Sequence, residues 1–188
     1  MERKTEMAVY ACSDIHGQYS LFQKMLEGIR FSEDDKLYIL GDLIDRGPES
    51  LRVLQDVMQR TNVTCLLGNH ELMMNDYLWS RGDRTWLSDA NGGIVTLRQY
   101  ADLGEESKRR VFNFIKSLYF QAEIRVGGKV FLLSHSGFVK NKRSIKWTEL
   151  QEEDVFSLVW ASPWRFWEYI PEEAYDADGR IQDRKSVV

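Results

Sequence analysis

The segments MAVYACSDIHG (residues 7–17), LYILGDLIDRG (37–47) and VTCLLGNHE (63–71) decide the fold, because each is an apolar run that ends in a polar cluster. The length and the β-branched and aromatic content of these runs are typical of buried strands. Between them, apolar residues recur at helical spacing over residues 21–29 and 51–58, behind Ser20 and Pro48 as start signals. The order β-α-β-α-β predicts an α/β fold with neighbouring, largely parallel strands.

A fourth apolar run, VFLLSHSG (residues 130–137), also ends in a polar cluster. We expect it to be a buried strand and the second arm of a hairpin that turns at Gly127-Gly128. Further helices are expected over about residues 71–78 and 107–118. All the histidines of the chain fall in the four polar clusters. Since loops beyond the carboxyl ends of strands meet in one crevice, we expect a single site at the C-terminal ends of the strands.

Five side chains in these clusters have the chemistry of metal ligands: Asp14, His16, Asp42, Asn69 and His135. Oxygen and nitrogen donors without a thiolate suit Mn²⁺, Fe²⁺, Zn²⁺ or Mg²⁺, and the number of donors allows more than one ion. Asp14 and His16 are two residues apart at a strand end, so they point the same way and can share one ion. Asp42 can bridge both ions with its two oxygens. Asn69 and His135 supply donors to the second.

Each of these residues also has a simpler interpretation. A lone Asp14 or Asn69 after a strand is most often a turn residue or a helix cap, and a lone histidine is usually a satisfied polar group. Turn chemistry does not require all the histidines, however, so their joint occurrence after four strands favours the metal site. The role of Glu71 has two alternatives: it is either a negative charge in the first turn of a helix, or a hydrogen-bonding partner of a metal ligand or of Arg46.

Composition excludes several other classes of protein. The 25 basic and 29 acidic residues give a net charge of −4, which does not support nucleic acid as a partner. No apolar run approaches the roughly 20 residues of a membrane span, so no membrane partner is expected. The charged N-terminus lacks the apolar region and cleavage site of a secretory signal, which predicts a cytoplasmic location. Cys12 and Cys65 lie inside apolar runs and are expected to be buried thiols.

Taken in order, residues 14–17 (DIHG), 41–47 (GDLIDRG) and 68–71 (GNHE) resemble the GDxHG, GDxxDRG and GNHE signatures of the calcineurin-like metallophosphoesterases, in their phosphoprotein phosphatase branch. Ser13 stands where that family usually has glycine, at a turn position that is not a ligand. Trp86 and Asn91-Gly92-Gly93 resemble a W…NGG stretch of bacterial members. The resemblance implies a central β-sandwich flanked by helices, with the site at the C-terminal ends of the strands.

The resemblance also implies roles for individual residues. Asp14, His16 and Asp42 would hold the first metal, and Asp42, Asn69 and His135 the second, with a bridging water attacking phosphorus. His70, paired with Asp45, would give a proton to the leaving oxygen. Arg46 would bind the phosphate and stabilise charge in the transition state.

One departure from the family concerns the C-terminal part of the chain. Members normally add a further histidine to the second metal, and residues 136–188 contain none. Ser186-Val187-Val188 resembles the start of an interrupted strand, so we expect a single metallophosphoesterase domain over residues 1–188 that lacks its C-terminal strands. A second phosphate-binding arginine is hard to place, and Arg165 is open between that role and a surface or packing role.

The first interpretation is therefore a metal-dependent phosphomonoesterase that resembles bacterial serine/threonine protein phosphatases, acting on a phosphorylated protein. The runner-up is a diadenosine tetraphosphate hydrolase with a nucleotide substrate, in which Trp164, Phe166 and Trp167 could stack an adenine or simply belong to the core. A third reading is an inactive remnant that binds metal. Intact Asp45, Arg46 and His70 argue against it, because a pure binding protein has little use for a general acid.

Overall fold

The computed structural model describes residues 7–80, 82–139, 142–146, 155 and 158–160. Its helices are α1 (Tyr19–Gly28), α2 (Ser50–Val57), α3 (Asn69–Trp79), the short 3₁₀ helix η1 (Arg84–Leu87), α4 (Gly93–Ala101) and α5 (Glu105–Ser117). Its strands are β1 (Val9–Cys12), β2 (Lys36–Ile39), β3 (Val63–Cys65), β4 (Tyr119–Val126), β5 (Lys129–Ser134) and β6 (Ile145–Lys146). This element order confirms the mixed α/β class.

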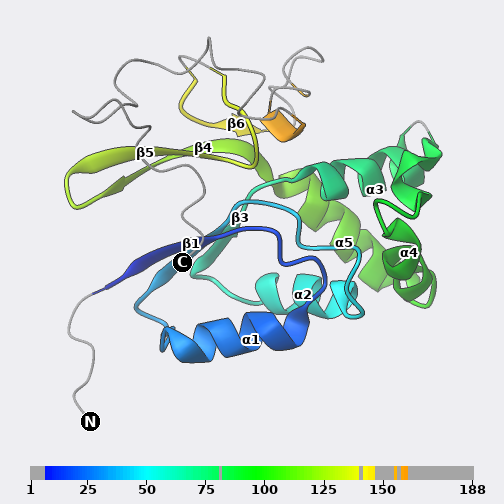
Figure 1. Ribbon diagram of the computed structural model, residues 1–188, viewed down its shortest axis with the longest axis horizontal. Helices are drawn as coiled ribbons and strands as arrows, with labels where there is room; N and C mark the ends of the chain where they lie inside the picture. The colour runs from blue at the N-terminus through cyan, green and yellow to red at the C-terminus, as the bar shows by residue number, and fades with distance from the viewer. Residues whose placement is uncertain (1–6, 81, 140–141, 147–154, 156–157, 161–188) are drawn as a thin grey trace.

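The first sheet is parallel, in the order β1-β2-β3, as the β-α-β-α-β pattern predicts. Helices α1 and α2 lie along one side of it (Figure 1). Apolar residues of β2 are at its centre, and Leu37 and Ile39 are essentially inaccessible to solvent. Because the three strands run the same way, the loops that follow them emerge at one edge of the sheet.

The second sheet is antiparallel, in the order β5-β4-β6, and contains the predicted hairpin. It joins the first sheet just beyond β3, where the backbone N–H of Leu67 donates to the carbonyl of Tyr119 at 2.8 Å. The expectation that β5 is buried is wrong, since Val130 and Phe131 are 50% and 45% exposed. Consecutive residues on a strand face opposite sides, so both faces of this outer strand are open among the described residues.

Several local predictions need correction. Helix α1 begins at Tyr19, so Ser20 lies inside it and Gln18 takes the N-cap position. Helix α3 begins at Asn69 rather than after Glu71, which puts the polar GNHE cluster into the first turn of the helix. Helix α4 was not predicted. Its first residue, Gly93, ends the Asn91-Gly92-Gly93 stretch, whose residue types are typical of a turn.

Both cysteines are buried free thiols, as expected. They lie in register on β1 and β3 with Ile39 of β2 between them, so two strand spacings keep the sulfur atoms apart. Burial raises the pKa of the Cys12 thiol to about 12 and that of Cys65 further.

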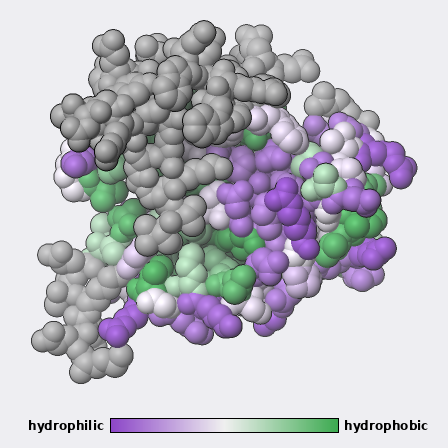
Figure 2. Space-filling view, in the orientation of Figure 1, coloured by the Kyte–Doolittle hydropathy of each residue, from purple (hydrophilic) through white to green (hydrophobic). Residues whose placement is uncertain are grey.

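The surface fits this arrangement. Hydrophilic side chains cover much of the right-hand part of the face in Figure 2, over the helices, whereas hydrophobic side chains gather at the left and centre, over the strands. No helix in the described part of the chain is both long and apolar enough to cross a bilayer.

Candidate active site

The loops after β1, β2, β3 and β5 bring the five candidate ligands together around the carboxylate of Asp42. Asp42 Oδ2 lies 3.7 Å from His16 Nε2 and 3.5 Å from His135 Nε2. On one side, Asp14 Oδ1 is 3.9 Å from His16 Nε2, and on the other, Asn69 Oδ1 is 2.9 Å from His135 Nε2. Asp42 therefore stands between two donor pairs, Asp14 with His16 and Asn69 with His135.

The donor set fits divalent cations. His16 Nδ1 is 3.0 Å from the carbonyl of Ile44, and His135 Nδ1 is 2.7 Å from the carbonyl of Leu40. A carbonyl only accepts, so both Nδ1 atoms carry a proton, and in the neutral form of each ring the lone pair is on Nε2, the nitrogen nearer the Asp42 carboxylate. Histidines that ligate metals are held this way, by a backbone acceptor on the nitrogen facing away from the ion.

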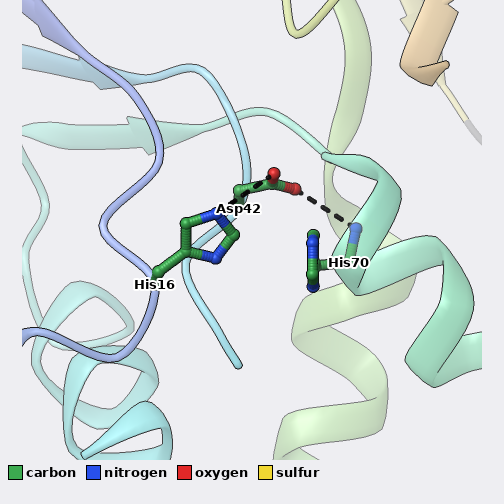
Figure 3. A group of neighbouring side chains, drawn as sticks. All are labelled: His16, Asp42 and His70. Atoms are coloured by element: carbon green, nitrogen blue, oxygen red, sulfur yellow. Dashed lines mark hydrogen bonds and ion pairs between the residues drawn. The ribbon is translucent and has the colours of Figure 1, made fainter. Parts of the chain in front are cut away.

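His16, Asp42 and His70 offer ligand atoms within 4.8 Å of one another and are all buried (Figure 3). Burial lowers the pKa of His16, and this cause outweighs the opposing bond to Ile44 and the carboxylate of Asp42. The neutral, ligating form of His16 is thereby favoured.

Backbone strain is concentrated at this site. Among the described residues other than glycine, six have a positive φ, and all but Arg30 belong to the signature loops: Asp14, His16, Asp42, Asp45 and Arg46. Such left-handed conformations cost about 1 to 2 kcal/mol per residue and persist only where the surroundings fix them. The loops are thus held in conformations that aim these side chains into the site.

Glu71 fixes the loop after β2. Its buried carboxylate accepts from the backbone N–H groups of Asp42 (2.9 Å), Leu43 (2.8 Å), Ile44 (3.3 Å) and Gly68 (2.9 Å). Complete burial and the nearby Asp42 raise the pKa of Glu71 to about 7, against the opposing backbone bonds. Both interpretations that the sequence leaves open therefore apply, because Glu71 lies in the first turn of α3, where it bonds the backbone of Gly68, and also holds the backbone of Asp42.

Asp45 and His70 form a buried pair. His70 Nδ1 lies 2.7 Å from Asp45 Oδ2, and neither side chain is appreciably accessible. Burial by itself lowers the pKa of His70, but the hydrogen bond to Asp45 and the carboxylates of Asp42 and Asp45 outweigh it, so the net direction is upward. This environment favours a protonated imidazole whose second nitrogen, Nε2, faces the site.

The guanidinium of Arg46 lies between the two histidines. Its Nη1 is 2.7 Å from His16 Nε2 and its Nη2 is 3.2 Å from His70 Nε2. The side chain is exposed on one side, so it can swing away from both nitrogens. A cation held by His16 Nε2 requires that movement, which would leave the guanidinium free to bind an anion above the site.

The sequence did not predict the residues that contact Asp45. These are Ser50, Trp86 and Thr96. Trp86 was noted only as part of a resemblance. Thr96 offers a weak signal, since it is a polar residue on the inner face of α4. Arg165, Trp164, Phe166, Trp167 and Val187-Val188 lie outside the described residues.

Comparison with known proteins defines the class. Residues 7–179 match the family of calcineurin-like phosphoesterases, and the chain belongs to that family. It is therefore among the hydrolases that act on phosphoric esters, and members of the family use divalent metal ions.

Two kinds of relative are found within this family. Serine/threonine-protein phosphatase 1 of Salmonella typhimurium is 30% identical over 162 residues, which are 86% of this chain and 71% of that protein. The symmetrical bis(5'-nucleosyl)-tetraphosphatase of Nitrosospira multiformis is 46% identical over only 68 residues, 35% of this chain and 25% of that protein.

A solved structure supports the fold. The crystal structure of a "putative diadenosine tetraphosphatase" superimposes with a TM-score of 0.51 at 18% identity, covering 79% of this chain and 61% of that one. At this identity the likeness concerns the fold alone, and it confirms the expected calcineurin-like architecture.

Proposed function

We propose that this protein is a metal-dependent phosphomonoesterase whose substrates are phosphoserine and phosphothreonine side chains. The observation that carries the proposal is the buried Asp45–His70 pair at 2.7 Å, placed beside a cluster of oxygen and nitrogen donors and next to Arg46. A pure binding site needs the donors but not a general acid, so the combination favours hydrolysis over an inactive metal-binding remnant.

Asp14, His16 and Asp42 would hold one divalent ion, and Asp42, Asn69 and His135 a second. When bound, two such ions would activate the attacking water and offset negative charge on the phosphoryl group. Mn²⁺ is the proposed metal, with Fe²⁺, Zn²⁺ or Mg²⁺ as alternatives, because all four suit a donor set of carboxylates, an amide oxygen and imidazoles without sulfur. Glu71 keeps the Asp42 loop in place through its bonds to the backbone.

The organic side chains complete the reaction. The imidazolium of His70 donates its Nε2 proton to the leaving alkoxide oxygen as the P–O bond breaks, and Asp45 keeps the ring oriented through Nδ1. Arg46, once withdrawn from the histidines, binds phosphate oxygens through two N–H groups and offsets the charge that develops on them. The products are an alcohol, which takes that proton, and inorganic phosphate.

The extent of each similarity favours a phosphoprotein over a dinucleotide as substrate. The match to the Salmonella phosphatase extends over 86% of the chain, whereas the match to the Nitrosospira tetraphosphatase covers 35%. The higher identity of the shorter match keeps symmetrical diadenosine tetraphosphate hydrolysis as the second candidate.

The deciding experiment compares kcat/KM, in Mn²⁺, on a phosphoserine peptide and on diadenosine tetraphosphate. Asp42→Asn protein, purified in parallel, measures background from other phosphatases. We expect hydrolysis of the peptide to exceed that of the dinucleotide. The opposite order would establish the tetraphosphatase, and no hydrolysis of either substrate above the Asp42→Asn background would establish the inactive remnant.

A further inference from the structure

The carboxylate of Asp45 is held by residues from outside the strand loops. Trp86 Nε1 donates to Asp45 Oδ2 at 2.7 Å, and Thr96 Oγ1 donates to Oδ1 at 2.6 Å. The backbone N–H of Asp45 in turn donates to the hydroxyls of Ser50 (2.9 Å) and Thr96 (3.1 Å). His70 is the other partner of Oδ2, so a fully buried carboxylate has a defined partner on each oxygen.

The glycine pair before α4 makes room for these contacts. A Cβ at Gly93 would stand 2.5 Å from Trp86 Nε1, the donor atom itself, and 2.4 Å from the Trp86 carbonyl. Gly92 has φ +72°, and a Cβ there would lie 3.1 Å from the backbone nitrogen of Arg46. Asn91 closes the turn by donating from Nδ2 to the Thr85 carbonyl. The stretch from Trp86 to Gly93 thus packs directly beneath the Asp45-Arg46 turn.

We propose that Trp86 and Thr96 are positioning residues for proton transfer, which act by orienting Asp45 toward His70. An indole N–H can only donate, so Trp86 occupies one lone pair of Asp45 Oδ2 and leaves the other lone pair of that oxygen for His70 Nδ1. Thr96 anchors the other oxygen and prevents the carboxylate from rotating. His70 Nε2 is then directed into the site, and a small error in its direction is costly, because general acid catalysis depends on geometry.

This inference rests on the proposed function, since it assigns Trp86 and Thr96 to the reaction that His70 is proposed to assist. Neither residue touches a candidate metal ligand's donor atom or the space above Arg46 in the contacts described. A merely structural role would lower stability, and with it the amount of active protein, equally for every substrate. A positioning role predicts an effect that depends on the leaving group.

The test uses two changes that remove a single donor. Trp86→Phe removes the indole N–H and keeps an aromatic ring, and Thr96→Val removes the hydroxyl at nearly constant volume. Thr96→Ser restores the hydroxyl and serves as the conservative rescue. Trp79→Phe is the matched control, because Trp79 is a half-buried tryptophan that packs on Tyr100 at 6.0 Å and not on the Asp45–His70 pair. Thr96→Val keeps the test available if Trp86→Phe does not fold.

Rates are measured in Mn²⁺ on phenyl phosphate, a poor leaving group, and on 2,4-dinitrophenyl phosphate, which needs little protonation. We expect Trp86→Phe and Thr96→Val to lower kcat on phenyl phosphate roughly 10-fold to 100-fold, as small misplacements do. In these two variants KM stays unchanged, and kcat on the dinitrophenyl ester falls much less than kcat on phenyl phosphate. Thr96→Ser and Trp79→Phe have the kcat of the parent protein on both substrates. In a His70→Asn background, Trp86→Phe has no further effect. Equal losses on both substrates, or an added loss in that background, would overturn the inference.

A second readout does not depend on turnover. NMR spectra of ¹⁵N-labelled, metal-free protein resolve the indole N–H resonances, and the resonance that disappears in Trp86→Phe belongs to Trp86. We expect this resonance to move upfield in Asp45→Asn, because the indole N–H no longer donates to a charged acceptor. The Trp79 indole resonance stays in place. An unmoved Trp86 resonance overturns the inference, whatever the rates. If His70→Asn itself shows no dependence on the leaving group, the proposed function fails instead, and the indole resonance still decides whether the contact to Asp45 exists in solution.

Discussion

The two sheets of this protein differ in how firmly they hold the site. The centre of the parallel sheet is buried, with Ile39 on β2 fully inaccessible, whereas Val130 on the outer strand β5 of the antiparallel sheet is 50% exposed. The loops after β1 and β2 and the first turn of α3, which follows β3, carry seven of the candidate site residues: Asp14, His16, Asp42, Asp45, Arg46, Asn69 and His70. The antiparallel sheet brings one, His135.

This difference shows two ways of placing a functional group. In the parallel half, backbone contacts fix the loops, as when Glu71 accepts from the loop after β2 and from Gly68 before α3. On the antiparallel side, His135 itself makes the contacts, to the Leu40 carbonyl and to Asn69. We infer that the parallel half is preorganised, and that the antiparallel half, which is joined to it by the backbone bond between Leu67 and Tyr119, contributes one imidazole to the site.

The largest effect is expected at the point where the two halves meet. Asp42→Asn weakens both candidate ions at once and should lower kcat on a phosphoserine peptide by more than about 10⁴-fold, because metal assistance is worth several kcal/mol. Initial rates and circular dichroism on the same sample check this. Retention of substantial activity by a folded Asp42→Asn protein would show that Asp42 does not join the two halves.

The next effect separates the general acid from the ligands within the parallel half. His70→Asn should slow turnover on poor leaving groups by roughly 10² to 10⁴ and leave metal content unchanged, because its Nδ1 is bound to Asp45 and only the proton at Nε2 is lost. Rates on phenyl phosphate, together with metal analysis after dialysis, test it. Loss of a metal ion in this variant would make His70 a ligand.

A smaller and more selective effect is expected on the antiparallel side. His135→Ala should weaken the second Mn²⁺ by at least about 10-fold, since even the hydrogen-bonding partners of metal ligands are worth that much, and leave the ion at Asp14 and His16 in place. Calorimetric titration with Mn²⁺ measures the affinity of both sites. His70→Asn is the control variant, which is expected to bind both ions. Unchanged binding of two ions would remove His135 from the site.

The smallest effects concern stability, and here the two sheets can be compared by matched truncation. Ile39→Ala should cost about 2 to 5 kcal/mol of unfolding free energy, because it leaves a cavity in the core. Val130→Ala should stay within about 0.5 kcal/mol, as for other exposed positions. Urea unfolding of the three proteins checks the pair. Similar losses at both positions would mean that β5 is covered in solution.

The same difference explains which features can be predicted from the sequence. The parallel strands and the loops after them are encoded locally, by short apolar runs followed by Asp14, Asp42 and Asn69, so both the strands and the convergence of their loops could be foreseen. The exposure of β5 could not, because VFLL has the composition of a buried strand and only tertiary packing decides what covers it. Helix α4 was missed because Gly92-Gly93 conceals the helix start.

Long-range contacts set the other limit. The position of Glu71 in GNHE allows a role as the partner of a ligand. It does not predict that Glu71 accepts from four backbone N–H groups in two different loops. Likewise, Trp86 reaches Asp45 across 41 residues of sequence and Thr96 does so across 51. Such contacts have no local signature, since they depend on how η1 and α4 pack against the loop after β2.

The claim that both sheets deliver ligands to one metal-dependent phosphoesterase site is tested most directly by removing and restoring the metal. The protein is dialysed against a chelator, its metal content is measured, and hydrolysis of a phosphoserine peptide is followed as Mn²⁺ is added back. We expect no activity in the metal-free protein, and full recovery that parallels the binding of two ions per chain. Undiminished hydrolysis by protein shown to be free of metal would contradict the account.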